Sequence, residues 1–237
     1  MQHVVSRLAL RTAASLLLVA GAWAQPAKTA GHWQGKIKIG DRDVPIVVDL
    51  AQNGEGVWIG SITVTGSSSR DVPLSGLTVG AIVQFTASLP EPAKFKGSVS
   101  ADGNTLSGTA SNAQGDAPFE LMRAGDGNVK LPPPSSRLTK EFEGEWLGTL
   151  DPSGRARRIG LKLAPAADGS ATATITVIEK NMQLAADTVT LKGAEITFEL
   201  RAVSGVYRGT LGAGGEIAGE WSEGGNRTTL TFARAAK

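Results

Sequence analysis

Apolar and polar side chains alternate along much of the chain with a period of two, which is typical of β-strands that bury one face. In the segment 44–50, for example, Ile46, Val48 and Leu50 fall on the same face. The segment 172–177 is rich in threonine and β-branched residues, which strands favour. The 3.6-residue spacing of an amphipathic helix does not stand out anywhere, so the pattern predicts an all-β protein.

The alternating pattern occurs twice. The segment 31–35, GHWQG, returns 113 residues later as GEWLG at 144–148. The apolar positions of 46–50 return at 159–163 with the same offset. The offset falls to 111 by the end of the repeat, and both changes lie near turn sequences. The sequence therefore predicts an internal duplication.

Turn dipeptides such as Asp102-Gly103 divide the first repeat into short strands. We predict eight of them, at 32–39, 44–51, 56–65, 72–79, 81–88, 93–100, 104–111 and 116–123. Short connections favour antiparallel neighbours, and eight such strands are enough to close a barrel. The predicted fold is all-β, with two tandem eight-stranded antiparallel up-and-down barrels and no catalytic domain. An open curved sheet, or one sheet shared by both repeats, is the alternative.

The predicted organisation has four parts. Residues 1–24 read as a signal peptide, because an apolar run follows two arginines and Ala22-Trp23-Ala24 fits the small-x-small cleavage rule. Cleavage after Ala24 predicts a secreted or periplasmic protein. A first barrel at 31–124 and a second at 144–237 flank a linker at 125–143. The linker contains three consecutive prolines, which favour an extended, semi-rigid spacer.

Charge and composition exclude several classes of function. The 24 basic and 22 acidic residues become 22 of each once residues 1–24 are removed, because that segment carries two arginines and no acid. A neutral chain offers no basic domain for nucleic acid. Outside the signal peptide no apolar stretch is long enough for a membrane-spanning helix. The absence of cysteine excludes disulfides and thiolate chemistry.

Short motifs in each repeat resemble two groups of known β-modules. Gly-x-Trp opens the first strand, and an arginine, Arg123 or Arg234, closes the last. These features resemble the lipocalin-like (calycin) barrels. The repeats are also similar to the β-domain that precedes serine hydrolase domains in secreted bacterial proteins. No hydrolase domain accompanies them here, so the second resemblance implies no activity.

The calycin resemblance implies a specific closure of each barrel. In that superfamily the tryptophan lies at the closed base and the arginine packs across it, which pairs Trp33 with Arg123 and Trp146 with Arg234. Pairing of the first strand with the last also brings these residues to one rim. We predict that each guanidinium lies within about 6 Å of its indole centroid, at cation–π distance.

Few residues suggest catalysis or metal binding. The only histidine after residue 24 is His32, which cannot form a multi-histidine metal site. The sequence contains no Gly-x-Ser-x-Gly elbow and no phosphate-binding loop. We therefore predict no catalytic residues, no metal, no cofactor and no enzymatic activity.

Five residues are weak candidates for ligand binding. Trp58 and Trp221 stand outside the repeat, since alanine occupies the equivalent position in the other unit. Exposed aromatic rings can stack on sugars or cap a pocket, although more often they fill a core. Arg155, Arg157 and Arg158 follow a turn and form a basic cluster.

Two classes of function stay open at this point. One is a secreted, non-catalytic interaction module that binds a polymer or a protein, for which two sites on one chain raise the effective concentration. The other is a carrier of a small apolar ligand, as the lipocalin resemblance implies. Exposure of the two tryptophans would favour the module, and an enclosed cavity would favour the carrier.

Overall fold

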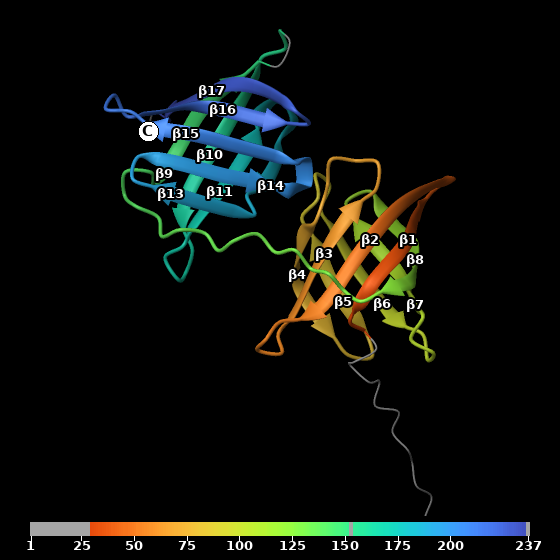
Figure 1. Cartoon of the computed structure of the whole chain (residues 1–237). Coiled ribbons are helices and arrows are strands. Elements are labelled where there is room, and N and C mark those ends of the chain that lie inside the picture. Colours follow the sequence, from red (N-terminus) through yellow and green to blue (C-terminus); the bar gives the residue numbers. More distant parts are fainter. Residues whose placement is uncertain (1–28, 152–153, 236–237) are drawn as a thin grey trace, which may run out of the picture.

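The computed structural model describes residues 29–151 and 154–235, which form two all-β units joined by an extended linker (Figure 1). The predicted fold class, two tandem antiparallel barrels, is confirmed. The predicted signal peptide and its cleavage site lie outside the described residues.

The first unit is a closed barrel in which every strand pairs with its neighbours in sequence and β1 pairs with β8. Each of the eight strand ranges predicted from sequence corresponds to one observed strand. The strands are β1 (Gly31–Ile39), β2 (Arg42–Gln52), β3 (Trp58–Val64), β4 (Val72–Val79), β5 (Val83–Ala87), β6 (Ala93–Val99), β7 (Thr105–Asn112) and β8 (Gly115–Gly125).

The second unit is a curled sheet of nine strands with the order β12-β11-β10-β9-β17-β16-β15-β14-β13. Its strands are β9 (Gly144–Leu150), β10 (Arg157–Pro165), β11 (Ala171–Val177), β12 (Met182–Ala185), β13 (Thr188–Lys192), β14 (Glu195–Leu200), β15 (Gly205–Leu211), β16 (Glu216–Glu223) and β17 (Asn226–Arg234). Two short 3₁₀ turns, η2 (Ile178–Lys180) and η3 (Arg201–Val203), complete it.

The ninth strand arises because the fourth strand of the repeat is interrupted at Ala186-Asp187. The Asp187 carboxylate accepts a 2.6 Å hydrogen bond from the backbone N–H of Arg201, while the equivalent residue in the first barrel is the apolar Leu74. Backbone hydrogen bonds hold the interrupted residues to both neighbouring strands. The Ala186 N–H donates to Ala173 of β11, and the Asp187 N–H donates to Glu199 of β14, each at 2.8 Å.

The linker is extended, and both of its ends are bound to a barrel. Near its end, the Ser136 N–H donates to the Val189 carbonyl of β13, and the Ser136 carbonyl accepts from Ala171 of β11. The hydroxyls of Ser135 and Ser136 accept the N–H groups of Val189 and Leu191 at 3.0 Å. Ser136 therefore bridges β11 and β13, and Ser135 adds a further hydrogen bond to β13. The sequence predicted a spacer here and did not predict these contacts.

Aromatic side chains fill the interior of each barrel. In the first, Phe85 stacks on Phe95 with centroids 4.7 Å apart, and Phe119 meets Phe95 edge-on. In the second, Tyr207 stacks on Phe198 at 4.9 Å. Burial raises the pKa of Tyr207 far above its usual range, so its hydroxyl stays protonated and is placed to donate to the Ile217 and Leu230 carbonyls.

The tryptophan–arginine contact predicted from sequence is present in both units. The Arg123 and Arg234 Cζ atoms each lie 4.3 Å from the indole centroids of Trp33 and Trp146. Both tryptophans are buried, and each indole N–H donates to a backbone carbonyl four residues earlier. In the second unit that carbonyl belongs to Phe142, a linker residue that is itself buried under the barrel.

The two barrels meet where the β3–β4 loop of the first touches η3 of the second. The Ser69 hydroxyl donates to the Ala202 carbonyl at 2.7 Å, and the Arg70 N–H donates to the Arg201 carbonyl at 3.2 Å. The Arg201 guanidinium in turn donates to the carbonyls of Asp71 and Lys130. Arg201 thus holds the loop and the linker of the first half against the second barrel.

Candidate functional site

The candidate site is a hollow on the outer face of each barrel, over the first three strands of the repeat. On the first barrel the hollow measures about 400 Å³, and on the second about 570 Å³. The two are equivalent positions of the duplicated unit. Five residues that line the first hollow have an equivalent residue in the lining of the second. The pairs are His32 and Glu145, Val47 and Gly160, Asp49 and Lys162, Thr63 and Thr176, and Ala124 and Ala235.

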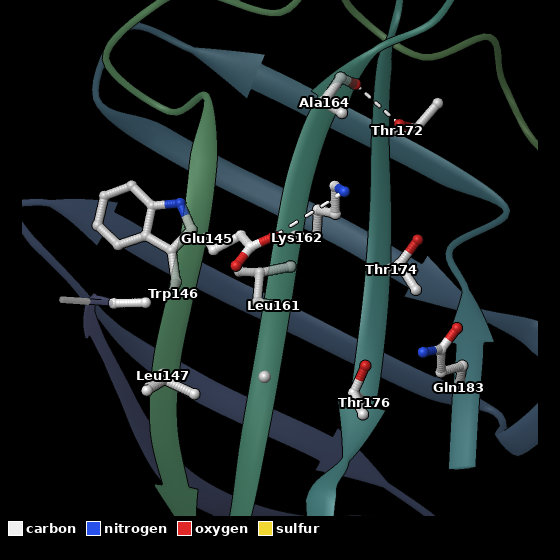
Figure 2. A pocket seen from close by; sticks show the side chains of 12 residues that line it. Glu145, Trp146, Leu147, Leu161, Lys162, Ala164, Thr172, Thr174, Thr176 and Gln183 are labelled. Carbon is white, nitrogen blue, oxygen red and sulfur yellow. Dashed lines mark hydrogen bonds and ion pairs between the residues drawn. The ribbon is translucent and has the colours of Figure 1, made fainter. Parts of the chain in front are cut away.

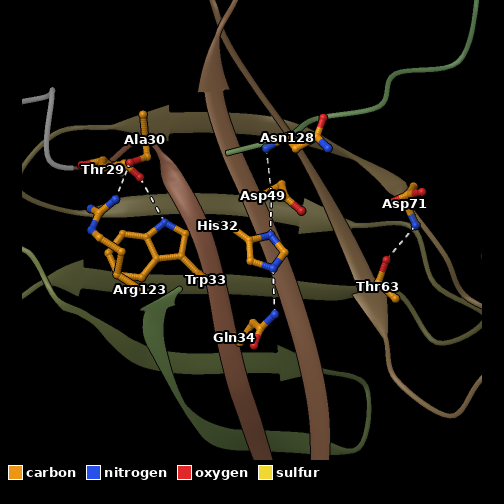
Figure 3. A network of polar contacts seen from close by, with 10 residues as sticks. All are labelled: Thr29, Ala30, His32, Trp33, Gln34, Asp49, Thr63, Asp71, Arg123 and Asn128. Atoms are coloured by element: carbon orange, nitrogen blue, oxygen red, sulfur yellow. Dashed lines mark hydrogen bonds and ion pairs between the residues drawn. The ribbon is translucent and has the colours of Figure 1, made fainter. Parts of the chain in front are cut away.

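On the first barrel the linker runs across this face. We call residues 126–130 the strap. The Asn128 N–H of the strap donates to the Asp49 Oδ1 atom at 2.8 Å (Figure 3). A methyl group on Gly127 would lie 2.2 Å from the Leu50 carbonyl oxygen, so this close approach of the strap to β2 requires glycine. The strap is therefore packed tightly on the sheet.

His32 and Asp49 form a polar pair beneath the strap (Figure 3). The Asp49 carboxylate lies 2.8 Å from His32 Nδ1, and the Gln34 amide nitrogen lies 2.8 Å from His32 Nε2. A carboxylate only accepts, so Nδ1 of His32 donates in its contact with Asp49. Both imidazole nitrogens are engaged, and this arrangement leaves neither free to activate a nucleophile.

We call the hollow of the second barrel the groove (Figure 2); among the described residues it is lined by β9–β12 and Ala235, and no linker residue lines it. Lys162 and Glu145 stand where Asp49 and His32 stand in the first barrel, so the carboxylate of the cross-strand pair lies on the first strand of the unit and not on the second. Their charged atoms are 3.9 Å apart, and their side chains are 63% and 69% exposed. Each charge is therefore accessible to a ligand.

The rest of the groove combines hydroxyl groups with one apolar contact point. Thr172, Thr174 and Thr176 follow one another along the outer side of β11, with Gln183 of β12 beside them (Figure 2). Leu147 of β9 is 48% exposed at the opposite side of the groove. Such a surface offers hydrogen-bond donors and acceptors at intervals along a strand and one apolar side chain for packing.

A third hollow of about 270 Å³ lies where the barrels meet. It is lined by Arg70, Asp71, Glu199, Arg201, Ser204 and Val206. Because Arg201 already donates to Asp71 and Lys130, this hollow belongs to the junction between the barrels.

The predicted ligand-binding tryptophans lie apart from the groove. Trp58 and Trp221 are both half-buried and pack against the core of their own barrel. The Trp221 ring leaves room only for glycine at position 205, and its N–H donates to Glu223 at 3.0 Å. A role of either ring in binding stays a prediction.

The predicted basic cluster lies in the β9–β10 loop and at the start of β10. Arg155, Arg157 and Arg158 are exposed, and Arg158 is paired with the Glu179 carboxylate at 3.1 Å. Backbone N–H groups, including that of Arg158, and to a smaller extent the Arg158 guanidinium lower the pKa of the Glu179 carboxyl group. None of the three arginines lines the groove.

The residues that form the two outer faces were not singled out from sequence as binding residues. The signal that could have found them is the exchange of a His–Asp pair for a Glu–Lys pair at offset 113, in strands that otherwise repeat. Within the described residues, no three side chains of histidine, aspartate or glutamate gather into a metal-binding group.

Comparisons with known proteins give no family for this chain. No protein-family model and no curated protein matches it. It is similar to a solved structure from Nostoc punctiforme, a protein of unknown function in the DUF3598 family, with 14% identity, 89% of this chain and 97% of that chain covered, and a TM-score of 0.25. It is also similar to a protein provisionally described as an outer membrane protein of Bacteroides fragilis, with 10% identity, coverage of 89% and 99%, and a TM-score of 0.29. These TM-scores support no inference about fold or function.

In the part of the chain that the structure describes, no helix has the length and hydropathy that a membrane span requires.

Proposed function

We propose that this chain is a secreted, non-catalytic binding module that recognises its partner through the outer faces of its barrels. One observation carries the proposal. The barrel interiors hold stacked aromatic rings, while the hollows described above lie on the outside of the sheets or at their junction.

The filled interiors favour this function over that of a carrier for a small apolar ligand. A lipocalin-type carrier needs an internal cavity large enough for its ligand. Here Phe95 and Tyr207, at the centres of the two aromatic stacks, are among the largest side chains that are completely buried. Secretion enters the proposal through the signal-like sequence of residues 1–24.

Photo-cross-linking from the barrel surface tests the proposal in the cells that produce the protein. A photoreactive residue at Leu147, in the groove, should yield a discrete covalent adduct. The same residue at Lys96, on the outside of β6, serves as the control and should not. Native mass spectrometry of the exported protein should show no retained lipid. A stoichiometric apolar ligand that stays bound would contradict the proposal and support a carrier.

A further inference from the structure

We infer that the groove of the second barrel binds an extended peptide segment of a partner protein, with an acidic side chain of that segment over Lys162. The inference rests on the proposed function and names the partner and the site of that function. It starts from the duplication, because the first barrel shows what the equivalent face does with a polypeptide.

The occupant of the first barrel's face is known from the structure itself. The strap crosses β1 and β2 in an extended conformation, and its backbone N–H bonds to the charged residue of β2, Asp49. That contact leaves Asp49 only 7% exposed, and Ser61 beside it on β3 is 2% exposed. A sheet face with this curvature therefore accommodates an extended chain.

The second barrel retains the shape of that face. The β9–β10 and β10–β11 registers repeat those of β1–β2 and β2–β3, so Lys162 pairs with Glu145 and Thr174 as Asp49 pairs with His32 and Ser61. The larger volume of the groove has a local cause. Gly160 replaces Val47, and the lining of the groove includes no linker residue, whereas Asp126, Asn128 and Lys130 line the first hollow.

The charge of the segment is inferred from Lys162, which occupies the position of Asp49. At the position where Asp49 accepts a backbone N–H, Lys162 presents three donors and requires an acceptor. Its contact with Glu145, at 3.9 Å and largely exposed, contributes little and is easily replaced. A carboxylate is the strongest acceptor that a peptide offers to an ammonium group. The threonine row of β11 is then placed to bond the peptide backbone, and Leu147 to pack against an apolar side chain.

Three octapeptides test the inference on a chain of residues 25–237. The first has the sequence of residues 124–131, and the other two carry Asn128→Asp or Asn128→Lys. Titration is followed by amide chemical shifts in the labelled protein. We expect the Asn128→Asp peptide to bind at least about tenfold more tightly than the Asn128→Lys peptide, a difference of about 1.4 kcal/mol. The shifted amides should include Leu147, Gly160 and Thr174.

Charge reversal at the site provides the matched comparison. Lys162→Glu should reverse the preference between the Asp and Lys peptides, and Lys162→Gln should abolish it. Lys96→Glu, the same change at an exposed position on the first barrel, should leave the preference unaltered. Lys162 is exposed, so both of its variants should retain the dispersed amide spectrum of the folded protein.

Two results would overturn the inference. One is the absence of groove shifts with each of the three peptides at about 1 mM, the weak limit of specific recognition. The other is that the same amides shift with a neutral hexasaccharide and with none of the peptides. That result would retain the proposed binding function of the outer faces but assign it a different ligand. Binding of palmitate inside a barrel would instead contradict the proposed function itself.

Discussion

The outer faces of the two barrels differ in what covers them: residues 126–130 cross the first, and within residues 29–151 and 154–235 no linker residue lines the groove of the second. Over β1–β3 the strap packs on the sheet, and the charged residue of β2 is buried. Over β9–β11 the equivalent residue is an exposed lysine. The repeat thus contains two copies of one surface, and sequence divergence at a few outward positions gives them different side chains.

The bases of the barrels show the opposite behaviour, because they hardly differ. Trp33 and Trp146 are both buried, and their arginines lie at the same 4.3 Å distance. The contrast indicates that the inward residues preserve the fold while the outward residues vary. The predictions below test this contrast, beginning with the change of largest expected effect.

Truncation of the buried tryptophan at the base of each barrel should destabilise the two barrels by similar amounts. Trp33→Leu and Trp146→Leu each remove a buried indole and leave a void, so each should lower the free energy of unfolding by about 3 kcal/mol. Arg234→Met retains the apolar stem and loses the cation–π contact, and should cost less, up to about 2 kcal/mol. Chemical denaturation followed by circular dichroism measures all three. A tryptophan variant without measurable loss would show that the base is not a structural element of its barrel.

Removal of the Asp49 charge on β2 should lower stability more than removal of the equivalent Lys162 charge on β10. Asp49→Ala leaves the Asn128 N–H and the His32 imidazole without their acceptor, which should cost about 1–3 kcal/mol. Amide exchange in residues 126–130 should accelerate at the same time, since the strap loses its hydrogen bond. Lys162→Ala, the equivalent change on the second barrel, should stay within about 0.5 kcal/mol of the wild type. Equal losses in both variants would contradict the difference between the faces.

The strand pattern made the barrels predictable, and the strap was not predictable for a physical reason. The alternation of apolar and polar residues reflects which side chains face the core, so it predicts strands such as β2. The recurrence of the Gly-x-Trp motif predicts the second unit. The strap sequence, Asp126-Gly-Asn-Val-Lys130, carries no such period and is typical of a loop. Its position depends on a contact with Asp49, 79 residues earlier, which local sequence does not encode.

The interrupted strand of the second barrel was missed for a similar reason. The pair Ala186-Asp187 looks like a polar end of a strand, yet its effect comes from the bond between Asp187 and the distant Arg201. The serines that bind β13 follow a triple proline and were interpreted as part of a spacer. The candidate groove also escaped sequence analysis, because its residues are ordinary outward positions of predicted strands.

Only the second barrel should depend on the linker serines. Ser136→Ala leaves the Leu191 N–H without its hydroxyl acceptor and should cost about 1–2 kcal/mol. Ser98→Ala, at an exposed position of β6 in the first barrel, is the control and should have no measurable effect. Hydrogen exchange locates the change, which should be faster in β13 and unaltered in β1–β8. Unchanged protection of β13 would show that the serine contacts do not stabilise the second barrel.

The smallest predicted effect concerns the charge of Asp187, at the interruption of the fourth strand of the second barrel. Burial raises the pKa of the Asp187 carboxyl group, despite the hydrogen bond from Arg201. A raised pKa means that the folded state binds this proton more tightly than the unfolded chain, so the contribution to stability is complete at low pH and lost as pH rises through the folded-state pKa.

Asp187→Asn retains the acceptor for Arg201 and does not titrate. Denaturation at a series of pH values should therefore show the variant gaining stability relative to the wild type as pH rises from about 3 to about 7. Leu74, the equivalent residue of the first barrel, has no charge to titrate. A difference that stays constant over this range would contradict the raised pKa.

A crystal structure of residues 25–237 with the Asn128→Asp octapeptide tests the central claim most directly. When the second barrel is superposed on the first, the peptide should lie over β9–β11 along the path that residues 126–130 take over β1–β3. Its central carboxylate should be within hydrogen-bond distance of Lys162 Nζ. A peptide bound elsewhere, or a groove that stays empty at saturating peptide, would contradict the equivalence of the two faces.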